Sequence, residues 1–168
     1  ALATEMTMSE DGLKYTFKIR EGQVWVDNQG RKVADVTADD WVAGMQHLFD
    51  AKGGLQSLLF GVIENAQEYA TGETTDFEQV GVKAVDEYTL EYTLAAPCAY
   101  FPTMLGYSLF APLCRDFYES QGGKFGVGLS AEDRNGNYGL TSTNIAYCGP
   151  YMVTSHTNKS MIVYDANP

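Results

Sequence analysis

Apolar and polar side chains alternate strictly over residues 13–20. One face of this stretch collects the apolar positions Leu13, Tyr15, Phe17 and Ile19, whereas Lys, Thr and Arg occupy the other. A period of two with aromatic and β-branched residues is typical of a half-buried strand. Residues 4–9 alternate as well, and the Asp11-Gly12 pair between the two stretches is a strong turn signal. The pattern therefore predicts a β-hairpin over residues 4–20.

After Thr37 the apolar period becomes that of a helix. Residues 37–40 have a capping-box pattern, which makes Thr37 the expected N-cap and places Asp40 three residues further on. The apolar residues that follow recur at helical spacing; they are Trp41, Val42, Met45, Leu48 and Phe49. Gly53-Gly54 is expected to end this helix. A second helix is predicted over residues 55–69.

The rest of the chain alternates between short periodic stretches and polar ones. Strand pairs are predicted at residues 80–85 with 88–94 and at residues 149–153 with 159–164, and a short helix at residues 115–120. Residues 27–35 and 126–144 are rich in polar residues and Gly, so both are predicted to be loops. The pattern as a whole predicts an α+β fold of hairpins and mixed sheet packed with helices.

Composition narrows the choice of partners. Of the 168 residues 45% are hydrophobic, which suffices for a core. Acidic residues number 22 and basic residues 11, which gives a net charge of −11. Binding to nucleic acid is not expected, because it requires clustered Lys and Arg. No apolar stretch approaches the roughly 18 residues of a membrane span.

No catalytic or metal-binding motif emerges from the titratable residues. Asp39 and Asp40 are adjacent on a predicted helix, so their side chains diverge, and helix capping accounts for both. The two histidines, His47 and His156, fit no triad, and neither a P-loop nor a nucleophile elbow is present. The chain is therefore expected not to be an enzyme and to need no cofactor. The alternative from a different functional class is a hydrolase domain.

The three cysteines are Cys98, Cys114 and Cys148, and their wide spacing fits no metal-binding pattern. An odd count leaves at least one thiol outside any disulfide within the chain. A disulfide between Cys98 and Cys114 is one alternative in an oxidising compartment. Three buried, unreactive thiols are the preferred interpretation.

The order of these elements resembles the peptide-binding, family-5 solute receptors of ABC importers. The resemblance depends on the succession of short elements rather than on any single one. They are the turn and strand of residues 11–22, the helix start at 37–40, the strands at 80–86 and 88–94, Tyr100-Phe101, Phe110-Ala111-Pro112, and Gly149-Pro150-Tyr151. The long segment between Trp25 and Thr37 looks more like receptors of Gram-positive bacteria.

The resemblance implies a type II periplasmic-binding-protein-like receptor with two large lobes and a smaller extra domain. Residues 1–113 correspond to the extra domain and residues 114–168 to a partial segment that returns to the first lobe. In this family the peptide is enclosed between the two lobes, which close around it like a hinge. Most of that cleft is expected to lie outside this chain, which looks like a fragment of a receptor.

Three residues are candidates for ligand contact on the basis of the same resemblance. Tyr100, Tyr107 and Ser108 lie in the segment that approaches the cleft side of the extra domain in the family. A Tyr side chain has an apolar body and a polar tip, which suits contact with peptides of varied sequence. The alternative is that these residues belong to the core or to a domain interface.

The function implied is that of an extracellular oligopeptide receptor, lipid-anchored at the cell surface, which delivers peptides to the permease subunits of an ABC transporter. Other solutes remain open for the same fold, namely a nickel complex, a sugar or a peptide pheromone. A structural module without binding of its own is a further alternative. Because the strands of residues 149–165 are expected to lack sheet partners, self-association of the chain is also predicted.

Overall fold

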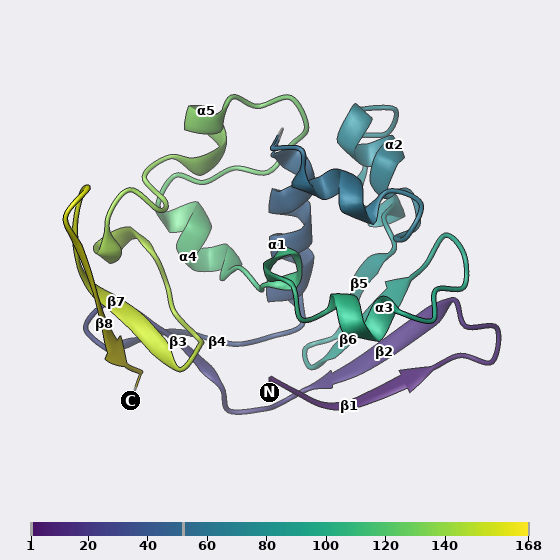
Figure 1. Cartoon of the computed structure of the whole chain (residues 1–168), viewed down its shortest axis with the longest axis horizontal. Coiled ribbons are helices and arrows are strands. Elements are labelled where there is room, and N and C mark those ends of the chain that lie inside the picture. Colours follow the sequence, from purple (N-terminus) through teal and green to yellow (C-terminus); the bar gives the residue numbers. More distant parts are fainter. Residues whose placement is uncertain (1, 52, 168) are drawn as a thin grey trace. The chain divides into compact units, whose positions relative to one another are not determined.

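The computed structural model describes residues 2–51 and 53–167, which form two compact units (Figure 1). Unit 1 contains residues 1–21, 37–113 and 125–129, and unit 2 contains residues 22–36, 114–124 and 130–168. The predicted division after residue 113 coincides with one unit boundary, but both units are discontinuous in sequence. The correspondence of residues 1–113 and 114–168 to an extra domain and a first lobe stays a prediction.

A four-stranded antiparallel sheet forms one side of unit 1. Its strands are β1 (Ala3–Met8), β2 (Lys14–Ile19), β5 (Val82–Asp86) and β6 (Thr89–Thr93), in the order β1-β2-β6-β5. Phe17 lies opposite Leu90 in the β2–β6 register, and both side chains are buried. Both hairpins predicted for this region, and the α+β class, are confirmed.

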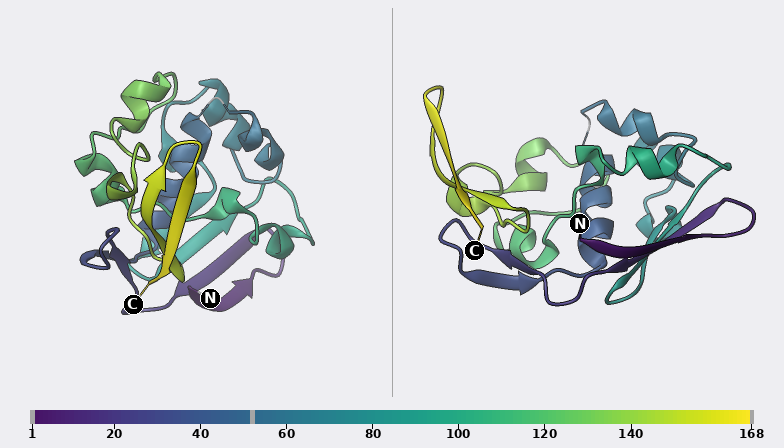
Figure 2. Two further views of the ribbon diagram at one scale, coloured as in Figure 1. Left: turned by 60° about the vertical axis from the view of Figure 1, so that its left-hand side comes forward. Right: turned by 60° about the horizontal axis from the view of Figure 1, so that its bottom comes forward.

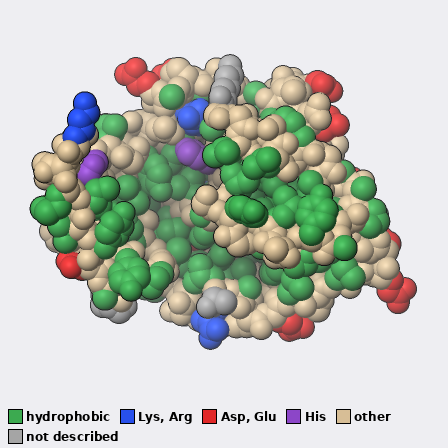
Figure 3. Space-filling model, in the orientation of Figure 1, with side chains coloured by type: hydrophobic (Ala, Val, Ile, Leu, Met, Phe, Trp, Pro, Cys, Tyr) green, Lys and Arg blue, Asp and Glu red, His purple; other side chains and the backbone are tan. Residues whose placement is uncertain are grey.

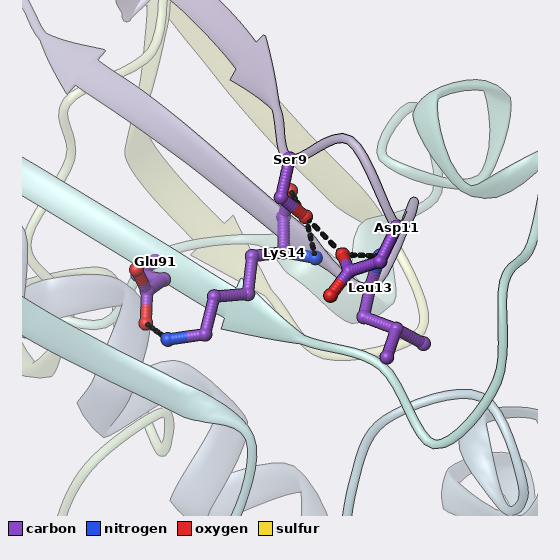
Figure 4. Close-up of polar contacts among 5 residues, drawn as sticks. All are labelled: Ser9, Asp11, Leu13, Lys14 and Glu91. Atoms are coloured by element: carbon purple, nitrogen blue, oxygen red, sulfur yellow. Dashed lines mark hydrogen bonds and ion pairs between the residues drawn. The ribbon is translucent and has the colours of Figure 1, made fainter.

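Hydrogen bonds fix the turn between β1 and β2 (Figure 4). The Ser9 hydroxyl donates to the Asp11 carboxylate at 2.6 Å, and the same carboxylate accepts the Leu13 N–H at 3.0 Å. The Lys14 N–H donates to the Ser9 hydroxyl at 2.9 Å, while its ammonium group pairs with Glu91 on β6 at 3.0 Å. The turn is therefore joined to the sheet through side chains as well as through the backbone.

Asp11 and Asp27 lie in hairpin turns and Asp86 is the last strand residue before one; we refer to the three as the turn carboxylates. The hydrogen bond from Ser9 is the main cause that lowers the pKa of Asp11 below its ordinary 3.8. A hydrogen bond from the Thr89 hydroxyl does the same for the pKa of Asp86. Burial opposes ionisation of Asp27, but its hydrogen bonds with Arg31 outweigh that cost and lower its pKa too. All three are held in their ionised form.

Helix α1 (Asp39–Asp50) packs against the sheet and against the segment near residue 111. Its start differs from the prediction, because the N-cap is Ala38 and not Thr37. The side chain of the N-cap residue makes no hydrogen bond to the helix. The Asp40 carboxylate does accept the Thr37 N–H at 2.8 Å, so the return half of a capping box forms. A Cβ on Gly44 would meet the Ala111 carbonyl oxygen, which shows how closely the helix approaches this segment.

The single helix predicted over residues 55–69 is wrong. The structure has a 3₁₀ helix, η1 (Leu55–Leu59), and a separate short helix, α2 (Ala66–Thr71). The chain turns between them, where Gly61 and Asn65 adopt positive φ values of 71° and 54°. Ile63 lies between these turns, is buried, and forms a β-bridge with Leu94. Tertiary pairing has overridden the helical propensity of this stretch.

Asp50, at the end of α1, joins three parts of unit 1. The residue is 1% exposed, and its carboxylate accepts a hydrogen bond from the Tyr69 hydroxyl of α2 at 2.9 Å. It also accepts the backbone N–H of Gly126 at 2.7 Å, which holds residues 125–129 against the unit. Burial is the main cause that raises the pKa of Tyr69 to about 12, and the Asp50 charge adds to it.

Unit 2 contains a short hairpin where a loop was predicted. Strands β3 (Val24–Val26) and β4 (Lys32–Asp35) pair antiparallel, so the loop prediction is wrong for residues 32–35, whereas residues 27–31 form the loop between the strands as predicted. Asp27 forms the turn by accepting the N–H groups of Gln29 and Arg31 at 2.9 and 3.0 Å. Three of the four β4 residues are exposed, which is why apolar alternation gave no strand signal there.

The predicted loop at residues 126–144 also contains structure. Helix α5 (Ala131–Asn135) begins at Ser130, whose hydroxyl accepts the Asp133 N–H at 3.0 Å, and a 3₁₀ turn, η4 (Ser142–Asn144), follows. The predicted helix α4 (Arg115–Ser120) is confirmed, and its Tyr118 hydroxyl donates to the Arg134 carbonyl oxygen of α5 at 2.5 Å. The buried Tyr118 thus holds α5, which has few apolar residues, against α4.

The final strand pair is present as β7 (Tyr151–Thr157) and β8 (Met161–Ala166) (Figure 2). Among the described residues these two strands pair only with each other. Apolar side chains on both strands are exposed, including Tyr151, Met161, Ile162 and Tyr164. The expectation of strands without further sheet partners therefore agrees with the described part of the chain.

Two negative findings concern the described residues. None of their helices has both the length and the apolar character needed to cross a membrane. No disulfide joins any of the three cysteines: Cys98 and Cys114 are buried thiols, whereas Cys148 is only half-buried. The prediction of three buried thiols is thus wrong for Cys148.

Candidate ligand-binding surface

Two phenylalanines anchor the segment that carries the predicted site residues. Phe101 is fully buried, and Phe110 is 5% exposed. The Phe101 ring lies 4.9 Å from that of Tyr15, 5.5 Å from that of Tyr92 and 5.8 Å from that of Phe110, between centroids. Two of these contacts are edge-to-face, the arrangement favoured by aromatic quadrupoles. The segment is therefore fixed to the inner face of the sheet at both ends.

Between these anchors the backbone makes two short helical turns. Helix α3 (Phe101–Met104) has Pro102 in its first turn, where a missing N–H costs little, and η3 (Ser108–Phe110) follows. The Tyr107 N–H donates to the Met104 carbonyl oxygen at 2.9 Å, and the Phe110 N–H donates to the Tyr107 carbonyl oxygen at 3.1 Å. Local hydrogen bonds thus set the backbone on which the exposed side chains stand.

All three predicted site residues are exposed. Tyr100, just before α3, has 63% of its surface exposed, and Tyr107, just before η3, has 66%. Ser108 adjoins Tyr107 and is exposed as well, whereas Tyr100 stands at the other end of α3. The structure therefore places none of the three in the core of the chain. Whether they contact a ligand stays a prediction.

The segment that contains these three residues is uncharged. Residues 98–113 contain no Asp, Glu, Lys, Arg or His. Tyr100 forms a hydrogen bond with the Cys98 side chain, which is the main cause that raises the pKa of its phenol group. Hydroxyl groups, aromatic rings and backbone groups are thus the chemistry that this segment presents. Such a surface suits an uncharged, variable ligand better than one recognised by its charge.

Hydrophobic side chains gather over the part of unit 1 that contains α3 (Figure 3). The prediction from sequence did not include Leu55 and Leu58 of η1, which are 59% and 60% exposed. Residues 55–69 were predicted to form one helix, and that prediction did not single out these leucines as exposed. The available signal was Gly61, which interrupts the helical period only a few residues later.

Among the described residues no three His, Cys, Asp or Glu side chains come together as metal ligands. The buried carboxylate Asp50 is engaged by Tyr69 and Gly126. The exposed segment instead presents uncharged side chains on a backbone that local hydrogen bonds define.

Comparison with known proteins identifies relatives of the whole chain. The family model for "Bacterial extracellular solute-binding proteins, family 5 Middle" matches residues 1–168. The oligopeptide-binding protein AmiA of Streptococcus pneumoniae serotype 4 is 37% identical over 167 residues, which are 99% of this chain and 24% of AmiA. The chain thus spans about a quarter of the length of the curated relatives it matches.

Solved structures give the same result for the fold. An oligopeptide ABC transporter substrate-binding domain from Bacillus anthracis str. Ames superposes with a TM-score of 0.80 at 32% identity, covering 99% of this chain and 29% of that one. The pheromone receptor PrgZ superposes with a TM-score of 0.78 at 27% identity, over 99% and 30% respectively. The mixed α/β structure is therefore part of a type II binding-protein fold, as predicted.

Proposed function

The chain belongs to the family 5 bacterial extracellular solute-binding proteins, and from that premise we propose that it forms part of an oligopeptide receptor that supplies an ABC importer. The observation that carries the proposal is the uncharged segment 98–113, fixed by buried phenylalanines and exposed along α3 and η3. Peptides of varied sequence share a backbone and differ in side chains, so a receptor for them gains little from fixed charges.

Within this receptor Tyr100, Tyr107 and Ser108 contribute contacts to the bound peptide. Each tyrosine offers an apolar ring for side chains and a hydroxyl for backbone carbonyl groups. The receptor acts outside the cytoplasm, held to the cell surface by a lipid anchor, and passes its ligand to permease subunits. Affinity and release are its only requirements, so the chain performs no covalent chemistry.

A peptide pheromone is the second candidate ligand. The similarity to the pheromone receptor PrgZ over nearly the whole chain favours it. Both candidates are peptides, and they differ in whether the receptor accepts many sequences or one. A receptor for a single sequence would bind its own peptide far more tightly than a mixed pool.

Isothermal titration with a mixed pool of di- to hexapeptides tests the proposal. The titration is run on this chain and on the full-length receptor, with a mixture of sugars as the control ligand. We expect saturable heat with the peptides for the full-length receptor and little or none for the chain alone, because most of the cleft lies elsewhere. Heat with sugars only, or with neither mixture, contradicts a peptide receptor.

A further inference from the structure

Three sulfur-containing residues line one pocket of unit 1. The pocket has a volume of about 540 Å³ and lies between β1, the hairpin turn that follows it and residues 97–102. Met6, Met8 and Cys98 are among its lining residues, and all three belong to unit 1. The pocket therefore combines two thioethers with one thiol, which are the side chains that soft metal ions prefer.

The register of the sheet places both methionines on one face. Met6 lies opposite Phe17 and Met8 lies opposite Tyr15 in the pairing of β1 with β2. Residues two apart on a strand, and residues directly opposite each other on neighbouring strands, point to the same side of a sheet. Because Phe17 and Tyr15 are buried, Met6 and Met8 point to the inner side of the sheet as well.

The two methionines are nevertheless accessible from solvent. Met6 is 47% exposed and Met8 is 59% exposed, since β1 is an edge strand of the sheet. A methionine side chain has three rotatable bonds and a polarisable sulfur, so it adapts to irregular surroundings. Both thioether groups can therefore turn toward an ion that enters the pocket.

Cys98 forms part of the opposite wall. Its carbonyl oxygen accepts the Tyr15 hydroxyl at 3.3 Å and the Phe101 N–H at 3.1 Å, which fixes the backbone at this position. Its side chain forms a hydrogen bond with Tyr100. Since Tyr15 lies opposite Met8 and reaches Cys98 with its hydroxyl, a single tyrosine side chain spans the distance between the two walls.

The rest of the lining selects against other kinds of ion. It consists of Gly, Ala, Pro and Tyr residues, without Asp, Glu, His, Lys or Arg. Mg²⁺ and Ca²⁺ require several oxygen ligands, and Zn²⁺ sites use His, carboxylate or several Cys ligands. Two thioethers and one thiolate instead suit a soft ion. A single thiolate also balances one positive charge, which favours a monovalent ion in apolar surroundings.

We propose that Met6, Met8 and Cys98 form a binding site for a soft monovalent metal ion, Cu(I) or Ag(I), held by two thioether sulfurs and one thiolate. The Cys98 thiol releases its proton to solvent when the ion binds, because the thiolate is the form that coordinates a metal. The bound ion and its ligands are then neutral together. The site does not depend on the proposed function.

The test is an NMR titration of the chain, labelled with ¹³C in its methionine methyl groups, with silver nitrate in buffer free of chloride. Silver is the probe because Ag(I) keeps its oxidation state in solution. We expect the Met6 and Met8 signals to shift along one common saturation curve. Met161 is 55% exposed in unit 2 and serves as the control thioether, whose signal should not move at these concentrations. Magnesium chloride should shift none of the three.

Cys98→Ser and Met6→Leu separate the contributions of the ligands. Loss of a residue that merely orients a metal ligand typically weakens affinity 10- to 100-fold, so loss of the thiolate in Cys98→Ser should weaken silver binding by at least about tenfold. Met6→Leu keeps the volume of the side chain but removes one thioether, so the affinity measured on the Met8 signal should also fall about tenfold.

Two controls accompany these variants. Cys148→Ser removes the half-buried thiol of unit 2 and should leave the curve of the Met6 and Met8 signals unchanged. The signal of Met45, which is 1% exposed in α1, reports whether each variant keeps the fold of unit 1. Its position in the silver-free variants should match that in the parent chain.

Three results would overturn the proposal. The first is that the Met6 and Met8 signals stay in place while silver binds elsewhere on the chain. The second is a different saturation curve for each methionine, which means separate contacts rather than one site. The third is an unchanged curve in Cys98→Ser, or an equal loss in Cys98→Ser and Cys148→Ser, because the Cys98 thiolate would then not be a ligand.

Discussion

Replacing Phe101 by alanine removes the central anchor of the exposed segment. Phe101 has no exposed surface and contacts the rings of Tyr15, Tyr92 and Phe110. A buried phenylalanine removes about 200 Å² from water, which at about 25 cal/mol per Å² corresponds to about 5 kcal/mol. Alanine retains part of this, so we expect Phe101→Ala to lower the free energy of unfolding by about 4 kcal/mol, within the usual range for such changes.

Urea denaturation followed by the NMR signal of Trp41 measures this loss within unit 1. Phe101→Leu is the matched control: it keeps most of the volume and loses the ring contacts, so we expect a loss of about 1.5 kcal/mol. Amide exchange at Tyr107 should accelerate in Phe101→Ala before global unfolding. A loss below about 1.5 kcal/mol in Phe101→Ala, or equal losses in the two variants, would refute the assignment of Phe101 as the anchor.

Four further predictions concern the scaffold. Gly44→Ala should lower the free energy of unfolding by about 2 kcal/mol, because the new methyl group meets the Ala111 carbonyl oxygen. The control Gly53→Ala, which has open space around it, should change that free energy by less than about 0.5 kcal/mol. Equal effects of the two substitutions in urea titrations would contradict the close approach at Gly44. Asp50→Ala should cost about 3 kcal/mol by thermal melting, since the buried Tyr69 hydroxyl and the half-buried Gly126 N–H lose their acceptor. Tyr69→Phe should cost only about 1 kcal/mol, and the reverse order would exclude Asp50 as the shared acceptor. The turn carboxylates have pKa values below 3.8 in the folded chain, so the stability that they contribute is complete above pH 3.8 and is lost as the pH falls through the lower folded values. Replacing all three by Asn should therefore flatten the acid limb of a plot of urea midpoint against pH. An unchanged acid limb would contradict this. The pKa of Tyr69 is raised from 10.0 to about 12, so the stability that its neutral hydroxyl contributes is present below pH 10 and is lost as the pH rises toward 12. Tyr69→Phe should therefore flatten the alkaline limb of the same plot, and an unchanged alkaline limb would contradict this contribution of Tyr69.

Sequence periodicity predicted the elements whose faces differ clearly in polarity. The alternation in β2 and the helical spacing in α1 each separate a buried face from an exposed one, and both elements lie where the pattern indicates. Strand β4 gave no such signal, because it is mostly exposed and is held by pairing with β3 and by the Asp27 turn. Periodicity therefore reports burial and misses strands that are held chiefly by backbone pairing.

Two other errors arose from interactions between distant residues. The break between η1 and α2 depends on the bridge from Ile63 to Leu94, which no local pattern reveals. Helix α5 has few apolar residues and is fastened by Tyr118, although its capping pattern at Ser130 was visible in the sequence. Local propensity was outweighed by tertiary contacts in the first case and supplemented by them in the second.

The candidate site could be predicted only in part. The resemblance to family 5 receptors pointed to Tyr100, Tyr107 and Ser108, and the sequence alone shows that their segment is uncharged. Their exposure follows from the burial of Phe101 and Phe110 against the sheet, which requires the fold.

In the proposed receptor the exposed, uncharged segment contacts the bound peptide. Isothermal titration of an oligopeptide into the full-length receptor, with Tyr107→Ala and Tyr164→Ala compared, tests this directly; Tyr164 is a similarly exposed tyrosine of unit 2. We predict that Tyr107→Ala weakens peptide affinity about tenfold, as expected for an aromatic contact residue, while Tyr164→Ala leaves it unchanged. Unchanged affinity in Tyr107→Ala, or equal losses in both variants, would contradict the claim.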